Sequence, residues 1–153
     1  MIARDELSRN RLFREFSGEE LDMVRIVVDE GTYDDGQLVI KEGDAGERLY
    51  LIDAGKCSVT TQISGAGTEE IKLLGAGDFF GEMSLLEAAP VSASVYARGS
   101  CRLLWLERKA FDRLTAEDMP VANKLLKAII LTFCERARET TKKIESYYKM
   151  SQF

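Results

Sequence analysis

The stretch "GDFFGEMSLLEAAPVSAS" (Gly77–Ser94) decides how the whole chain is interpreted. It combines a glycine-bounded turn, a carboxylate at Glu82 directly after the second glycine, a short helix-like run and a proline at Pro90. A carboxylate beside such a turn suits a small molecule that carries a hydroxyl group and an anion. The stretch contains no Lys or Arg to meet that anion, and this raises the question of what the pocket binds.

The residues around this stretch are short apolar runs cut by glycine. From about Glu30, turn signals recur at roughly ten-residue intervals, and the runs between them are "LVI", "RLYLI", "CSVTTQI" and "IKLL", followed by "ASVYA" and "CRLLWLE". In "CSVTTQI", apolar and polar residues largely alternate, which is typical of a half-buried strand. No strand–helix alternation is visible. The pattern predicts an antiparallel sandwich or β-roll of jelly-roll type.

Helical segments precede and follow the predicted strands. Ser17 and Glu20 have the spacing of a capping box, and a run without Gly or Pro over 121–148 predicts one long helix of about 40 Å. We expect its apolar stripe to pack on the roll as far as Phe133. The sequence therefore predicts a mainly β fold with flanking helices, in one structural domain with three parts: an N-terminal helical segment (1–29), the roll (30–110) and C-terminal helices (111–150).

The composition excludes several classes of function. The 153 residues include no histidine, which removes the common triads and zinc sites, and no paired carboxylates suggest an enzyme. Cys57, Cys101 and Cys134 have no metal-ligand spacing and are expected to be reduced core thiols. An acidic body does not attract nucleic acid. No membrane span or signal peptide is visible, so we expect a cytoplasmic protein that binds neither nucleic acid nor membrane.

These residues, in this order, resemble the cyclic nucleotide-binding domain family over nearly the whole chain. The resemblance rests jointly on Gly43-Asp44, Gly55, Gly77, Phe80-Gly81-Glu82 and Pro90. It implies an eight-stranded β-roll with a phosphate-binding cassette at 77–95. In that cassette, backbone N–H groups of Glu82, Met83 and Ser84 would face the cyclic phosphate, and Glu82 would accept the ribose 2′-hydroxyl. The alternative is that Glu82 only caps its own short helix. The candidate ligand-binding residues are Phe80, Gly81, Glu82, Met83, Ser84, Pro90, Val91, Ser92, Ala93 and Ser94.

The chain departs from the family pattern at Val91. The pattern after the proline is an arginine, which would bind the cyclic phosphate, and here that place is taken by valine. Loss of one side of a buried charged pair costs about 2–5 kcal/mol. Ser92 and Ser94 offer only neutral hydroxyls, and Arg98 has an odd offset from Val91 that points it to the opposite face of a regular strand. Arg102 and Lys41 cannot be placed from sequence. The ligand is a cyclic nucleotide, another small anion, or none.

We therefore interpret the chain as a non-catalytic regulatory module of bacterial type whose cassette is degenerate for cAMP and cGMP. The alternatives are a ligand-independent scaffold for protein interaction or dimerisation, and a true cAMP or cGMP sensor with a substitute for the arginine. The helix 121–148 is the candidate surface for a homodimer, above all from Ala137 to Tyr148, or for another protein partner. If the protein ends at Phe153, we expect no room for the DNA-binding domain found in many bacterial relatives; a DNA-binding regulator that continues past Phe153 is a further alternative.

Overall fold

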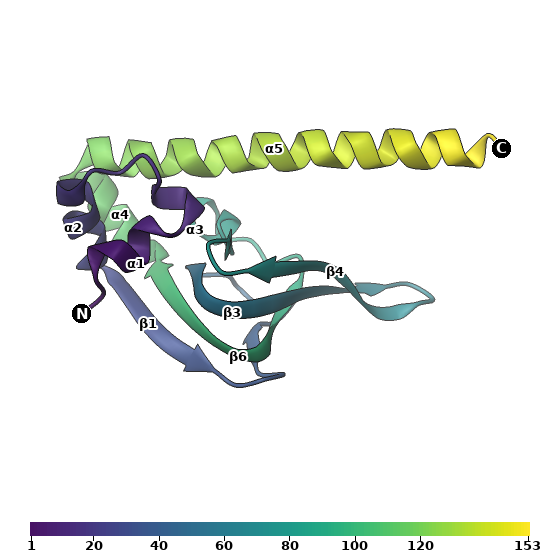
Figure 1. Ribbon diagram of the computed structural model, residues 1–153, viewed down its shortest axis with the longest axis horizontal. Helices are drawn as coiled ribbons and strands as arrows, with labels where there is room; N and C mark the ends of the chain where they lie inside the picture. Colours follow the sequence, from purple (N-terminus) through teal and green to yellow (C-terminus); the bar gives the residue numbers. More distant parts are fainter.

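The computed structural model describes residues 1–153, and its centre is one antiparallel sheet (Figure 1). Strands run in the order β1-β6-β3-β4, with β2 paired to β6 and β5 paired to β3. The predicted mainly β fold with flanking helices is confirmed. The strands are β1 (Val28–Tyr33), β2 (Leu38–Ile40), β3 (Arg48–Ile63), β4 (Gly67–Gly75), β5 (Phe79–Phe80) and β6 (Ser94–Glu107).

Two of the strands are longer than the sequence predicted. The runs "RLYLI" and "CSVTTQI" form the single strand β3, and "ASVYA" and "CRLLWLE" form the single strand β6, so six strands are present where the resemblance implied eight. In β3, Gly55 explains the difference, because it has a φ of +88° inside the strand and lies where the β3–β6 register shifts. A Cβ there would lie 2.6 Å from that of Cys101. The glycine is therefore a bend within a strand and not a turn between strands.

The helices gather on one side of the sheet and at one of its ends, and the last of them runs far past the others (Figure 1). Ser17 caps α2 as predicted, since its Oγ accepts the Glu20 N–H at 3.3 Å and the Glu20 carboxylate accepts the Ser17 N–H at 2.8 Å. The predicted N-terminal helical segment (1–29) contains two short α-helices separated by a 3₁₀ turn. The helices are α1 (Arg4–Ser8), η1 (Arg11–Phe13), α2 (Gly18–Arg25), α3 (Met83–Leu86), α4 (Arg108–Glu117) and α5 (Met119–Ser151).

The two faces of β3 supply two hydrophobic clusters. Leu49 and Leu51 join the cluster under the helices, and their neighbours Tyr50 and Ile52 join a second cluster on the other side, because successive side chains in a strand point to opposite faces. Cys57 and Cys101 are buried in the second cluster. Burial raises the pKa of the Cys57 thiol to about 12, so it behaves as a core side chain.

The long helix α5 has a buried first half and an exposed second half. Asp118 caps it by accepting the Val121 N–H at 3.1 Å, and Val121, Leu125 and Ile129 are buried against the body of the protein. Every residue after Arg136 is exposed. Cys134 is exposed as well, so its expected place in the core was wrong. No helix of the protein, α5 included, has a stretch apolar enough to cross a lipid bilayer.

Candidate functional site

A cavity of about 360 Å³ lies between the cassette, the strands of the roll and α5. This volume is in the range of small-molecule sites. Nine of the ten candidate ligand-binding residues line it, and Ser94 does not. The other residues of the lining come from β2, β3, β4, the loop after α3, β6 and α5: Ile40, Val59, Ile71, Lys72, Leu74, Glu87, Ala89, Val95, Phe133 and Arg136.

Gly81 places the cassette carboxylate in this cavity. Its φ of +78° is one that residues with a side chain rarely adopt, and a Cβ at this position would lie 2.6 Å from the carbonyl oxygen of Arg48. Only glycine allows the chain to pass this close to β3 and then turn into α3. The turn leaves Glu82 at the start of α3, with 6% of its surface exposed.

The carboxylate of Glu82 does not cap its own helix. It makes no capping hydrogen bond, and its Oε1 instead forms an ion pair with the guanidinium of Arg136 from α5. The same guanidinium donates from Nη2 to the carbonyl oxygen of Phe79 at 3.3 Å and lies 5.4 Å from the centre of the Phe79 ring. Arg136 therefore ties the cassette to the long helix.

Sequence reasoning missed Arg136. Its only signal was that a charged side chain interrupted the apolar stripe of α5, where the stripe would otherwise continue from Phe133 toward Ile144. A charge in such a position requires a polar partner, but the partner lies 54 residues away in the sequence.

The wall of the cavity beside Pro90 is formed by Val91, at the position where the resemblance led us to expect an arginine. The cassette loop is held by Gly43 N donating to Val91 O and Val91 N donating to Asp44 O, both at 2.9 Å. The side chain of Val91 packs toward Gly46: a Cβ added there would lie 2.8 Å from Val91 Cγ1 and 2.0 Å from Ser84 Oγ. The absence of a side chain at Gly46 thus leaves room for the side chains of Ser84 and Val91.

The cassette helix offers fewer backbone donors than the resemblance implied. The N–H of Ser84 donates to the carbonyl oxygen of Gly81 at 3.1 Å, so it is not free for a phosphate. The Ser94 hydroxyl accepts the N–H of Glu42 at 2.9 Å and holds the loop after β2. Ser92 lines the cavity and is exposed.

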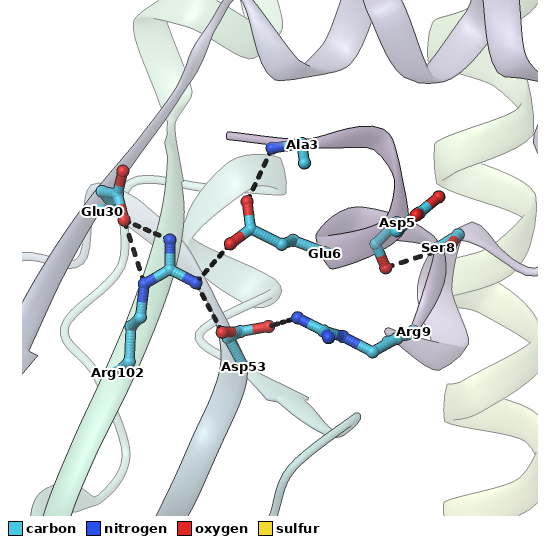
Figure 2. A network of polar contacts seen from close by, with 8 residues as sticks. All are labelled: Ala3, Asp5, Glu6, Ser8, Arg9, Glu30, Asp53 and Arg102. Atoms are coloured by element: carbon cyan, nitrogen blue, oxygen red, sulfur yellow. Dashed lines mark hydrogen bonds and ion pairs between the residues drawn. The ribbon is translucent and has the colours of Figure 1, made fainter. Parts of the chain in front are cut away.

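The basic residues considered as substitutes for the arginine are engaged or placed elsewhere. Arg98 pairs with Glu70 at 2.8 Å. Figure 2 shows Arg102 among three carboxylates on the side of the sheet that carries α1, where it joins this helix to β1 and β3. Lys41 is exposed and does not line the cavity. The three carboxylates around Arg102 are those of Glu6, Glu30 and Asp53.

Comparison with known proteins assigns the chain to a family. A model of the cyclic nucleotide-binding domain matches residues 30–118. The cAMP-dependent protein kinase type II regulatory subunit of Drosophila melanogaster is 40% identical over 94 residues, which are 61% of this chain and 25% of that protein. This chain thus spans about a quarter of that relative's length.

Solved structures agree with this assignment. A cyclic nucleotide-binding domain from Methylobacillus flagellatus superposes with a TM-score of 0.80 at 31% identity, covering 84% of this chain and 72% of that one. The catabolite activator protein of Thermus thermophilus gives a TM-score of 0.76 at 31% identity, covering 89% of this chain and 62% of the other. With its antiparallel roll, its cassette turn at Gly81 and these matches, the chain belongs to the cyclic nucleotide-binding domain family.

Proposed function

We propose that this chain is a non-catalytic regulatory module in which occupancy of the cassette cavity sets the position of α5. The observation that carries the proposal is the ion pair between Glu82 and Arg136. A ligand hydroxyl that hydrogen-bonds to Glu82 competes with the guanidinium or shares the carboxylate with it. Either event weakens or alters the contact between Arg136, near the middle of α5, and the cassette. Every residue of α5 after Arg136 is exposed.

The cassette is degenerate for cAMP and cGMP in this proposal. Val91 offers no charge to a cyclic phosphate, and the loss of such a partner costs about 2–5 kcal/mol. This is a loss of roughly 30- to 5,000-fold in affinity. The family membership and the regulatory relative support a module that recognises a small molecule, and the valine argues against a cyclic nucleotide as that molecule.

Hydrogen exchange of α5 tests the coupling. A Val91→Arg variant supplies the missing cation, so cAMP can be used as a known occupant. A ligand moves an equilibrium only by its differential affinity for the two arrangements, so we expect saturating cAMP to change amide protection in α5 around Arg136. The same change should vanish in a Val91→Arg/Arg136→Gln variant. Unchanged protection of α5 in the occupied Val91→Arg protein rejects the proposal.

We propose a second role, assembly with another copy of the chain through the exposed half of α5. Between Ala137 and Tyr148 the apolar residues Ala137, Ile144 and Tyr148 lie seven and four positions apart on one face of the helix, an imperfect form of the spacing found in coiled-coil seams. In the single chain, Ile144 is 62% exposed and Tyr148 is 66% exposed. The far half of α5 runs clear of the helical layer (Figure 1).

Light scattering after size exclusion tests this role. We expect a dimer for the wild type and a monomer for Ile144→Glu, while a matched change off the seam, Ser146→Glu, leaves the dimer intact. A wild-type monomer at about 100 μM, well above the dissociation constant of a stable interface, contradicts assembly through this seam.

A further inference from the structure

The charges of the cassette cavity cancel each other. Four charged side chains line it, two of each sign: Lys72 and Arg136, Glu82 and Glu87. Lys72 and Glu87 are exposed to solvent, whereas Glu82 is buried and already paired with Arg136. Arg136 is held by Glu82 and Lys72 is exposed to water, so the cavity has no buried cation that is free to neutralise an anion. A desolvated phosphate without a partner is strongly disfavoured.

The wall of the cavity beside Gly46 is formed by the hydroxyl group of Ser84 and the isopropyl group of Val91. Ser84 is 4% exposed, its Oγ makes no hydrogen bond to another protein group, and it lies beside Val91 at Gly46. Ser84 lines the cavity and its hydroxyl has no partner in the protein, so it is available to hydrogen-bond with a ligand there. A neutral donor or acceptor satisfies this hydroxyl, and the apolar Val91 beside it favours a partner without charge.

We propose that the cavity binds an uncharged, hydroxyl-bearing ligand in preference to an anion of similar shape, and that Ser84 and Val91 set this preference. One hydroxyl of the ligand donates a hydrogen bond to the Glu82 carboxylate, and a second polar group of the ligand hydrogen-bonds with Ser84 Oγ. The apolar part of the ligand packs against Ile40, Val59 and Val95. This inference rests on the proposed function, because it specifies the ligand whose occupancy α5 would report.

Calorimetric titration of the wild-type protein with a matched pair of probes tests the preference. The pair is cAMP and adenosine, which share base and sugar and differ in the cyclic phosphate. We expect adenosine to bind more tightly than cAMP by roughly tenfold or more, as the cost of an unpaired charge implies. A Ser84→Ala variant should weaken adenosine binding by roughly 2- to 12-fold, the worth of one neutral hydrogen bond. The control Ser92→Ala, at an exposed hydroxyl of the same cavity, should change it less than twofold.

Three results overturn the inference. They are wild-type affinity for cAMP equal to or above that for adenosine, absence of adenosine binding at 5 mM, and equal effects of Ser84→Ala and Ser92→Ala with both variants folded by circular dichroism. None of these three results tests the proposed function, which is tested by hydrogen exchange of α5 in the Val91→Arg protein with cAMP bound. Conversely, unchanged exchange of α5 in that protein would not alter the ratio of adenosine affinity to cAMP affinity in the wild type.

Discussion

Arg136 of α5 and Glu82 of the cassette form an ion pair across 54 residues of sequence, with the Glu82 side chain 8% exposed and that of Arg136 30% exposed. The pair joins the segment that lines the cavity to the helix that extends away from the roll. In the function proposed above, this pair makes the position of α5 depend on whether a ligand engages the Glu82 carboxylate.

Replacing Arg136 with Gln should destabilise the protein by about 1–3 kcal/mol, because it leaves the buried Glu82 carboxylate without its charged partner. Urea denaturation measures the free energy of unfolding. The matched control is Arg138→Gln, an exposed site two residues further along the helix, where we expect a change within about 0.5 kcal/mol.

A double-mutant cycle attributes the loss to the pair. Adding Glu82→Gln to Arg136→Gln should cost less than the sum of the two single changes, since both act on one interaction. Strict additivity of the two substitutions contradicts the direct coupling seen in the structure.

Gly81→Ala should be more destabilising than Gly65→Ala, although both glycines have positive φ values. A Cβ at Gly65 meets nothing within 4 Å, whereas one at Gly81 lies 2.6 Å from the backbone oxygen of Arg48. Both variants force alanine into a positive φ, so this backbone cost cancels when their free energies of unfolding are compared. The remaining difference is due to the clash at residue 81, which we expect to cost about 1–3 kcal/mol of stability. Thermal denaturation of the two variants measures it, and equal losses would show that the cassette turn relaxes freely.

The parts of the site that lie in one continuous segment could be predicted from sequence. The order of Phe80, Gly81, Glu82 and Pro90 located the cassette, and nine of ten candidate residues line one cavity. Arg136 could not be predicted, because the sequence contains many basic residues on α5 and does not show which one faces a carboxylate across the fold.

The predicted number of strands was wrong for a related reason. A glycine in sequence signals a change of backbone direction, but a bend within a strand and a turn between strands give the same signal. Only the close approach of Gly55 to Cys101 decides between them, and that contact is between residues distant in sequence.

Acid should weaken the attachment of α1 through Glu6. The Ala3 N–H, which donates to this carboxylate at 2.6 Å, and then Arg102 hold the pKa of Glu6 below its usual value of 4.5. A carboxyl whose pKa is lowered by folding contributes stability that is present above its unfolded pKa and is lost as the pH falls below it.

The measurement is the urea midpoint as a function of pH from about 7 to 3. We expect the wild-type midpoint to fall more steeply below about pH 4.5 than that of Glu6→Gln, which cannot titrate at this position. Asp5→Asn, a change at an exposed carboxylate on the same helix, should keep the wild-type slope. Parallel curves for all three proteins contradict a contribution from Glu6.

At most one thiol of the folded protein should react with a thiol reagent at pH 8. Cys57 and Cys101 are buried, and burial raises the pKa of both, that of Cys57 to about 12, so little reactive thiolate forms. Absorbance after addition of an aromatic disulfide reagent counts the reacting thiols, with three expected in denaturant. Rapid reaction of two or more in the folded state would contradict the buried placement of this pair.

The most direct test of the account is calorimetric titration of cAMP into the wild-type protein and the Val91→Arg variant. In our proposal, the cassette keeps its turn, its carboxylate and its cavity but lacks the cation for a cyclic phosphate. We expect near-millimolar or weaker binding to the wild type and a gain of roughly 30- to 5,000-fold in affinity on introducing the arginine. Micromolar binding to the wild type, with no gain in the variant, would show that another group supplies the charge and would contradict the central claim.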